Sequence, residues 1–255
     1  MPSIVVYEHP LTERMRSLLR LEHLFGALEA TASRTDPFSQ RGTVFRLLDL
    51  SGMFARYDLK TEILKELERH TGLLAPMRGQ AEVDGERLDR VLDELGRASD
   101  EIAAIDNHRL RDLRQHEMLN AISQRYNMPG GTCSFDLPDF HQWLVGPAEV
   151  RDADLARWLA PFEPLHRGVR LSLKLSRASA RPAPKVASGG FYQQSLDASK
   201  PLQLIRVALT SDDRCYPQIS GNKHRFTVRF VEPDSNGHAC ATEIDTAFQL
   251  TCCLI

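Results

Sequence analysis

A change in hydrophobic period near Gly168 constrains the fold of this chain more than any other feature of its sequence. Before this point, apolar residues recur every three or four positions, which is the spacing of helices that bury one stripe. Over 169–175, apolar residues instead alternate with arginine, serine and lysine, which is the period of a strand. We therefore predict an α+β fold, with a mainly helical N-terminal domain over residues 1–165 and an antiparallel β-sheet domain over 166–255.

Proline, glycine and capping residues divide the helical part. We expect the third helix to end at Gly72 and the fourth to begin at Asp84. The proline and paired glycines after Met128 should interrupt the helices again. The expected helices are Leu11 to about Ala30, Thr43 to Tyr57, Asp58 to His70, a fourth from Asp84, Arg109 to Tyr126, a short helix containing His141, and Asp152 to Phe162.

The strands expected in the C-terminal part are joined by short connections, which favours antiparallel pairing. The segment Ser179 to Ser188 is expected to be a mobile, mildly basic loop. The N-terminal strand at Ile4 to Tyr7 is a candidate for pairing with this sheet. The expected C-terminal strands are 169–175, Gly190 to Gln194, Leu204 to Leu209, His224 to Val231 and Thr242 to Leu250.

The charge and apolar content of the chain exclude several classes of protein. Its formal net charge of -2 gives no global field to attract nucleic acid or an acidic membrane, so a basic function needs a local patch. No apolar run is long enough to span a bilayer, and the N-terminus lacks the pattern of a signal peptide. Five cysteines form no framework of paired spacings, which indicates reduced thiols. We expect a cytoplasmic protein.

The motifs of common enzyme classes are missing, so we expect no catalysis and no cofactor. Cys133 and His141 could form a nucleophile and base, which leaves a hydrolase as one alternative, but a buried structural cysteine is the simpler interpretation. Zinc binding by His238, Cys240 and the Cys252-Cys253 pair is disfavoured, because structural zinc sites use closely paired ligands.

The segment Tyr216 to Phe230 shows the clearest functional pattern, because a turn leads into a strand with one apolar and one cationic face. Phe226, Val228 and Phe230 point to one side; Lys223, Arg225, Thr227 and Arg229 point to the other. That face carries no carboxylate, although like charges about 6.6 Å apart repel one another. The pattern indicates a docking surface for an anionic or mixed-charge peptide. A nucleic-acid-binding module is the alternative, but it would require several aromatic side chains on the basic face.

Four segments resemble the ZapD family of bacterial cell-division proteins and run in order along nearly the whole chain. They are Tyr7 to Leu11 with Met15-Arg16 and Leu19 to Glu22; Leu64 to Leu67; Pro129 to Pro138 with His141 and Trp143-Leu144; and Tyr216 to Gly221 with Lys223, Arg225-Phe226 and Arg229-Phe230. The last two are long and combine unrelated residue types, which makes the resemblance specific.

The resemblance implies a homodimer that binds the C-terminal tail of FtsZ, the tubulin-like GTPase of the division ring. Two tail sites per dimer would crosslink filaments into bundles and promote assembly of the ring and of the septum at midcell. The resemblance further implies which residues bind the tail: Arg16, Arg56, His141, Lys223, Arg225 and Arg229.

Overall fold

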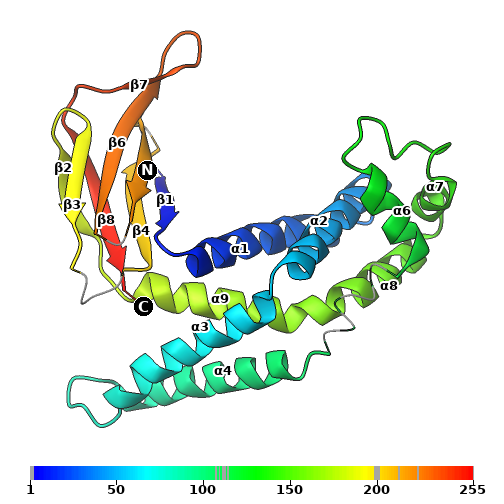
Figure 1. Cartoon of the computed structure of the whole chain (residues 1–255), viewed down its shortest axis with the longest axis horizontal. Coiled ribbons are helices and arrows are strands. Elements are labelled where there is room, and N and C mark those ends of the chain that lie inside the picture. The colour runs from blue at the N-terminus through cyan, green and yellow to red at the C-terminus, as the bar shows by residue number, and fades with distance from the viewer. Residues whose placement is uncertain are drawn as a thin grey trace. The chain divides into compact units, whose positions relative to one another are not determined.

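The chain folds into two compact units. The computed structural model describes residues 3–106, 108, 110, 113, 115–197, 202–211, 213–222 and 224–254 of the 255. One unit, here called the β unit, combines Met1–Leu19 with Leu173–Ile255; the other, the helical unit, comprises Arg20–Ser172. Two long helices, α1 (Glu13–Ala32) and α9 (Glu163–Ala178), contribute residues to both units (Figure 1).

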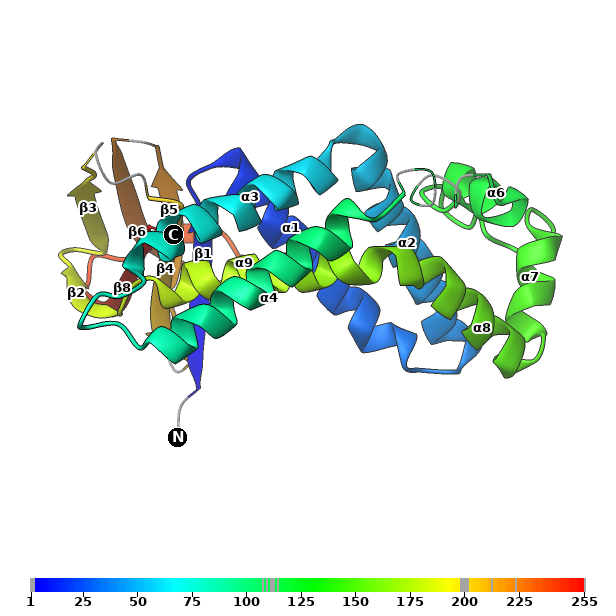
Figure 2. The same cartoon turned by 90° about the horizontal axis from the view of Figure 1, so that it is seen from below.

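The helical unit is built from amphipathic helices, as the sequence predicted. The helix α2 contacts α3, α6, α7 and α8 (Figure 2). The described helices besides α1 and α9 are α2 (Pro37–Arg56), α3 (Leu59–Leu74), α4 (Gly85–Ala103), α6 (Glu117–Arg125), α7 (Pro138–Val145) and α8 (Ala148–Leu159), with single 3₁₀ turns at Ala75–Met77 and Ala160–Phe162. The earlier part of the helix predicted over Arg109 to Tyr126 includes positions 109, 111, 112 and 114, which lie outside the described residues.

Aspartate caps set the starts of the helices. Asp84 Oδ1 accepts a hydrogen bond from the Arg87 amide (3.0 Å), which confirms the predicted start of α4. Asp36 caps α2 in the same way, followed by a proline in the first helical turn, so the predicted start at Thr43 was too late. The prediction that Gly72 ends α3 was also wrong, because the helix continues through it to Leu74.

The predicted strand over 169–175 is wrong, because these residues belong to α9. The exposed charged residues Arg167, Arg170 and Lys174 are three and four positions apart, so they form one stripe along a helix. The rest of the helix surface is largely buried, including Val169 and Leu173 at 0 % exposure. Apolar residues consequently also occur at every second position, which imitates the pattern of a strand.

Gly168 permits close packing of α9 against α3 and α4. A Cβ atom at this position would lie 2.6 Å from Ile102 Cδ1 and 3.2 Å from Ile63 Cγ2. Both isoleucines are fully buried. The glycine that marked the change of period is therefore a point of close helix contact and not a boundary between helix and strand.

The β unit contains two antiparallel sheets, and the N-terminal strand joins the first of them, as the sequence had suggested (Figure 1). Sheet A has the order β1-β4-β8-β2, and sheet B has the order β3-β6-β5, with β7 paired to β6. The strands of sheet A are β1 (Ile4–Pro10), β4 (Leu204–Thr210), β8 (Thr246–Cys253) and β2 (Ala183–Ala187). The strands of sheet B are β3 (Phe191–Ser195), β6 (Arg225–Pro233), β5 (Tyr216–Gly221) and β7 (Ala239–Ala241).

Besides the short strand β7, two segments that were not predicted as strands are part of the sheets. The loop expected over Ser179 to Ser188 contains β2, which pairs with β8. The turn expected before β6 is the strand β5. The turn from β2 to β3 requires glycine at position 190, where φ is +72° and a Cβ atom would lie 2.4 Å from the carbonyl oxygen of Thr242.

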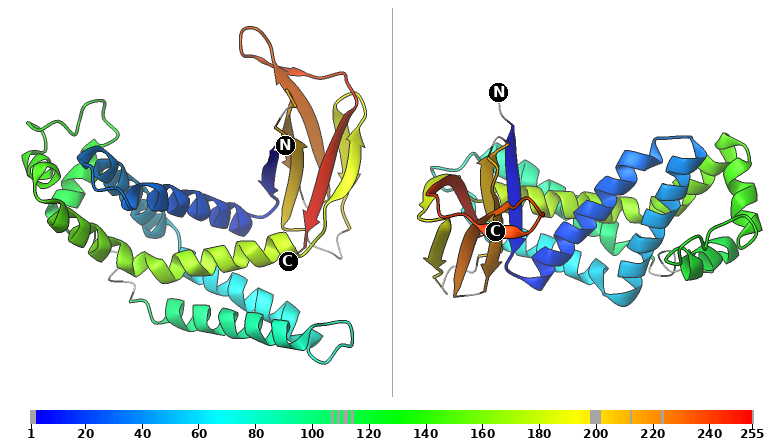
Figure 3. Two further views of the ribbon diagram at one scale, coloured as in Figure 1. Left: turned by 180° about the vertical axis from the view of Figure 1, so that it is seen from behind. Right: turned by 90° about the horizontal axis from the view of Figure 1, so that it is seen from above.

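One apolar core lies between the two sheets (Figure 3). Phe230 of sheet B packs against Phe248 of sheet A, with 5.2 Å between the ring centroids. Tyr192 meets the same Phe248 edge-on at 5.4 Å. The buried members of this core are Ala187, Ile205, Val207, Leu209, Phe226, Val228, Phe230, Phe248 and Leu250.

Candidate protein-binding site

The outer face of sheet B presents the predicted cationic strand. In β6, Phe226, Val228 and Phe230 are completely buried in the core, which confirms the predicted alternation. Arg225 and Arg229 are exposed on the opposite face. Four residues along a strand separate the two α-carbons by about 13 Å.

The neighbours of these arginines across the sheet are uncharged. Arg225 lies opposite Ser195 of β3, while Arg229 lies between Phe191 of β3 and Gln218 of β5. Between the arginines, Thr227 lies opposite Gln193 and Ser220. The name cationic face is used below for Arg225, Thr227, Arg229 and these five neighbours.

Neither arginine of the cationic face is neutralised within the described part of the chain. Among the residues that the structure describes, no carboxylate forms an ion pair with Arg225 or Arg229. An exposed guanidinium group without a partner offers a planar fork of N–H donors that matches a carboxylate. The face is therefore suited to an acidic peptide.

A tight turn fixes the start of β6. Asn222 Oδ1 accepts hydrogen bonds from the backbone amides of His224 (2.8 Å) and Arg225 (3.1 Å). The Asn222 amide in turn donates to the Arg225 carbonyl oxygen at 2.9 Å. Lys223, the third basic residue predicted for this face, lies outside the described residues.

Arg16 lies in the same unit as the cationic face. Just before α1, Leu11 approaches the last residue of β5 so closely that a Cβ atom on Gly221 would lie 2.7 Å from Leu11 Cδ2. The segment that leads into α1 therefore contacts the end of β5. Arg16 makes an exposed ion pair with Glu13 (3.2 Å), and its charge adds to burial in lowering the pKa of His9.

Arg56 and His141 belong to the helical unit, so their local surroundings are described separately. Arg56 ends α2, where its Nε donates to the Gly52 carbonyl oxygen at 3.3 Å. It lines a polar pocket of about 540 Å³ whose walls include Asn120 and Tyr126. His141 is exposed on α7. The structure thus brings Arg225 and Arg229 onto one face and Arg16 into the same unit.

The alternative chemistries find little geometric support. Cys133 is exposed, so the prediction of a buried structural cysteine was wrong. In the described structure, no hydrogen bond joins Cys133 to His141. Within the described ranges, no three His, Cys, Asp or Glu side chains are grouped so that they could hold a metal ion. None of the described helices is both long and apolar enough to cross a membrane.

Sequence reasoning did not find the residues of β3 and β5 that flank the two arginines. Gln193, Ser195 and Gln218 belong to the cationic face through strand pairing, and the register of that pairing cannot be read from one sequence. The sequence of β3, Phe-Tyr-Gln-Gln-Ser, does not alternate between apolar and polar residues, so it gave no signal that Phe191, Gln193 and Ser195 face outward.

Comparison with known proteins identifies the family. The sequence model of the ZapD family, described as a cell division protein, matches residues 19–229. A protein of Methylococcus capsulatus named cell division protein ZapD is 39% identical over 255 residues, which is the whole of both chains. Its namesake in Chromobacterium violaceum is 39% identical over 251 residues, covering 98% of this chain and 99% of the relative. The chain therefore belongs to the ZapD family of cell division proteins.

Proposed function

We propose that this protein binds the C-terminal tail of FtsZ on its cationic face and that a homodimer of it crosslinks FtsZ filaments. The observation that carries the proposal is the exposure of Arg225 and Arg229 on one strand face without an ion-pair partner in the described structure. Membership of a family of cell division proteins agrees with this role. The proposed role is non-enzymatic, needs no cofactor, and places the protein in the cytoplasm and at the midcell division ring.

The proposed contacts are ionic and individually weak. Exposed ion pairs contribute about 0.2–1 kcal/mol each, so one tail on one face would dissociate readily. A dimer presents two faces, and once the first tail is bound, the second binds at the effective concentration set by its tether. Arg16, Arg56, His141 and Lys223 are proposed as further tail-binding residues.

Reversal of the two central charges tests the proposal. The double substitution Arg225→Glu and Arg229→Glu should abolish co-sedimentation with FtsZ polymers, because the face would then repel an acidic tail. Both side chains point to solvent, so the thermal unfolding temperature and the dimer mass should stay unchanged. Bundling at the level of the unaltered chain by the double variant would refute the proposed face.

A second double variant controls for net charge. Arg87→Glu with Arg90→Glu makes the same change in charge on the exposed side of α4. It should bundle FtsZ filaments as the unaltered chain does. A loss of bundling in both double variants would show that overall charge, and not the cationic face, governs the interaction.

Binding of nucleic acid by the same face is the alternative, and one observation favours it. Phe191 is 43% exposed and is the cross-strand partner of Arg229, so one aromatic residue belongs to the cationic face. Single-strand binders stack bases on several such rings. A gel-shift titration with single-stranded DNA at physiological salt would distinguish the two: a shift that is lost in Arg225→Glu with Arg229→Glu supports the nucleic-acid module.

A further inference from the structure

Two backbone hydrogen bonds show which residues of β3 lie closest to the arginines of the cationic face. The Phe230 amide donates to the Gly190 carbonyl oxygen at 2.8 Å, and the Leu196 amide donates to the His224 carbonyl oxygen at 2.7 Å. Along an antiparallel ladder, hydrogen-bonded pairs alternate with pairs that share no hydrogen bond. The pairs without hydrogen bonds are therefore Phe191 with Arg229, Gln193 with Thr227, and Ser195 with Arg225.

Phe191 is the nearest cross-strand neighbour of Arg229. The α-carbons of a pair without hydrogen bonds lie about 4.5 Å apart, whereas those of a hydrogen-bonded pair lie about 5.5 Å apart. On the other side of β6, the Asn222 amide donates to the Arg225 carbonyl oxygen, so the ladder with β5 has the opposite phase at Arg229. Gln218 therefore forms the wider, hydrogen-bonded pair with Arg229, and Phe191 forms the closer one.

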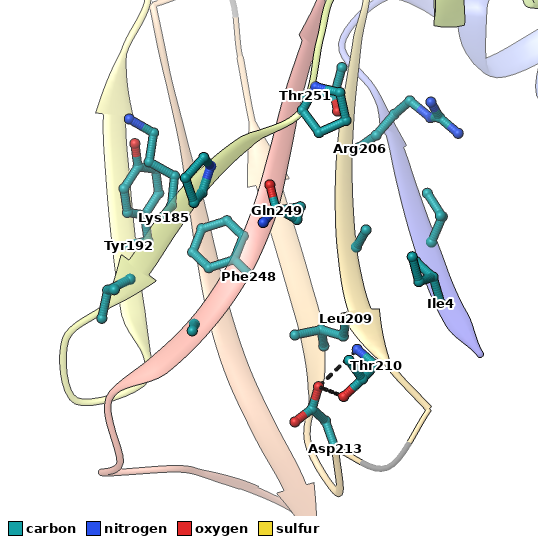
Figure 4. A pocket seen from close by; sticks show the side chains of 16 residues that line it. Ile4, Lys185, Tyr192, Arg206, Leu209, Thr210, Asp213, Phe248, Gln249 and Thr251 are labelled. Atoms are coloured by element: carbon teal, nitrogen blue, oxygen red, sulfur yellow. Dashed lines mark hydrogen bonds between the residues drawn. The ribbon is translucent and has the colours of Figure 1, made fainter. Parts of the chain in front are cut away.

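The Phe191 side chain lies on the outer side of sheet B. Its chain neighbour Tyr192 points the other way and meets Phe248 of the core edge-on, with 5.4 Å between the ring centroids (Figure 4). Successive side chains of a strand point to opposite faces, so Phe191 points away from that core. The end of the cationic face at Arg229 is therefore aromatic, whereas the end at Arg225 has the hydroxyl group of Ser195 as its neighbour.

The composition of the cationic face resembles the centre of a protein–protein interface. Aromatic residues and arginine are enriched at such centres, and lysine, aspartate and glutamate are depleted. The cationic face contains two arginines and one phenylalanine, and none of its residues is a lysine, an aspartate or a glutamate. The arginines alone would suit any anion. The aromatic side chain adds an apolar contact, so the face can distinguish between ligands of equal charge.

The charges of the cationic face favour an acidic peptide over the other occupants. In a two-fold contact between copies of this chain the face would meet itself, and Arg225 and Arg229 would then oppose arginines with no carboxylate between them. Single-stranded nucleic acid stacks its bases on several rings, whereas Phe191 is the one aromatic member of the face. A peptide that carries a carboxylate beside an apolar side chain satisfies both Arg229 and Phe191.

We propose that Phe191 is the apolar anchor of the cationic face and determines its specificity for the FtsZ tail. The face recognises an acidic residue of the tail together with an apolar residue one or two positions away, because such neighbours in an extended peptide match the close spacing of Arg229 and Phe191. The carboxylate binds Arg229, and the apolar side chain covers Phe191. Arg225 binds a further carboxylate through an ionic contact. This inference rests on the proposed binding of the FtsZ tail and adds to it a requirement for an apolar side chain.

Truncation of the ring tests the anchor at unchanged charge. Fluorescence anisotropy with a labelled peptide of the FtsZ tail should show binding about tenfold weaker to Phe191→Ala than to the unaltered chain. Phe191→Leu keeps an apolar side chain, so its dissociation constant should stay within about threefold of the unaltered value. Phe38→Ala, which removes an 85% exposed phenylalanine from the helical unit, is the matched control and should bind as the unaltered chain does. Thermal unfolding of each variant checks the fold.

The salt dependence of binding separates an apolar anchor from a change in the position of Arg229. Salt screens ionic contacts but not apolar ones, so the ratio of the dissociation constants of Phe191→Ala and the unaltered chain should stay constant between about 50 and 300 mM salt. The weakening caused by Arg225→Ala should instead shrink as the salt concentration rises. A ratio for Phe191→Ala that shrinks in the same way would show that the ring only positions a charge, and would overturn the proposal.

Two designed peptides test the requirement on the ligand. Both keep their aspartates at the same positions within a glycine and serine sequence, and they differ only in whether a single leucine follows an aspartate or stands at the far end. The unaltered chain should bind the first peptide several-fold more tightly, at about the ratio found for Phe191→Ala. Phe191→Ala should bind the two peptides equally. Equal binding of both peptides by the unaltered chain would contradict the requirement for an adjacent apolar side chain.

The outcomes distinguish a failure of this inference from a failure of the proposed function. If the tail peptide does not bind the unaltered chain, both are refuted. If the peptide binds, is lost in Arg225→Glu with Arg229→Glu, and binds Phe191→Ala at full strength, the inference alone is refuted. Weaker binding of single-stranded DNA by Phe191→Ala with unchanged binding of the tail peptide would assign the ring to a nucleic acid, and would likewise overturn the anchor.

Discussion

Arg225 and Arg229 differ from other arginines of this protein in what surrounds their guanidinium groups. Arg177 and Arg206 share the Glu8 carboxylate, and Arg69 binds Glu66. Composition alone could not distinguish these residues, because 34 acidic and 32 basic residues leave every pairing open. The alternation of β6 did predict which side chains face outward. The sequence could not show that Arg225 and Arg229 have no ion-pair partner in the described structure. Their neighbours depend on the register of strand pairing, which only the structure provides.

His70 makes the stability of the helical unit depend on pH. Its side chain is fully buried on α3, with Nε2 3.6 Å from Glu66 Oε1. Burial penalises the charged imidazolium and lowers the pKa of His70 to about 4; Glu66 opposes this shift, and Arg69 adds to it. In the unfolded chain a histidine pKa is about 6.5. As the pH falls below about 6.5, the unfolded chain therefore takes up a proton that the folded chain does not.

The free energy of unfolding should consequently fall by up to about 1.4 kcal/mol per pH unit between about 6.5 and 4 through this residue. His70→Met keeps a similar side-chain volume but has no titrating ring. The unfolding free energy of this variant should therefore lack the part of the pH dependence that His70 contributes. Urea unfolding of both chains at pH 7, 6 and 5 measures the difference. His23→Met, at an exposed position of α1, is the control. Parallel pH profiles for His70→Met and the unaltered chain would contradict the prediction.

At the scale of elements, a buried arginine joins α2 to the α7–α8 turn. Arg151 is 5% exposed, and its guanidinium group donates to the Gln40 side chain and to the carbonyl oxygens of Gly146 and Thr35. Gln40 also donates to Asp152 at 2.6 Å. One planar guanidinium group thus donates to acceptors in α2, in the segment before α2 and in the α7–α8 turn. It therefore fixes the start of α2 against the start of α8.

Arg151→Lys should destabilise the protein despite retaining the charge. A lysine cannot reach three acceptors in the plane of the fork, so buried carbonyl groups lose their donors at a cost of about 1–3 kcal/mol each. We expect a loss of roughly 2–4 kcal/mol in the free energy of unfolding, measured with denaturant. Arg90→Lys, on the exposed side of α4, should change it by less than about 0.5 kcal/mol. Equal stabilities of the two variants would show that the fork of Arg151 is not needed.

Elements with one buried face were predictable, and those buried on several sides were not. The caps and stripes of α4 and the alternation of β6 identify them correctly. The prediction for α9 was wrong because this helix is buried around most of its surface. Its apolar residues therefore fit both the period of a helix and the period of a strand. The strand β2 was missed for another reason: Pro184 within it, Pro182 just before it and its short length are typical of a loop, although proline is tolerated at a sheet edge.

At the scale of the whole molecule, the proposed crosslinking requires two intact cationic faces in one dimer. When Arg225→Glu with Arg229→Glu is mixed with the unaltered chain and the subunits exchange freely, bundling should follow the square of the intact fraction. At a threefold excess of the variant, about one dimer in sixteen would keep both faces, whereas about one subunit in four would still bind a tail. Light scattering of FtsZ polymers reports bundling, and co-sedimentation reports binding.

A bundling signal that falls in direct proportion to the intact fraction would contradict a two-site dimer. Mixing the unaltered chain with Arg87→Glu and Arg90→Glu, which keeps its cationic face, is the control and should leave bundling at full strength.

The insertion of the helical unit between β1 and the rest of the β unit sets the order in which the chain can fold during synthesis. Ile4 pairs with Thr210, so β1 is translated long before the strand that it pairs with. Pairings so distant along the chain form slowly, and an apolar strand left alone in the meantime is prone to misassembly. During synthesis, β1 therefore has no partner strand in sheet A until β4 has been translated.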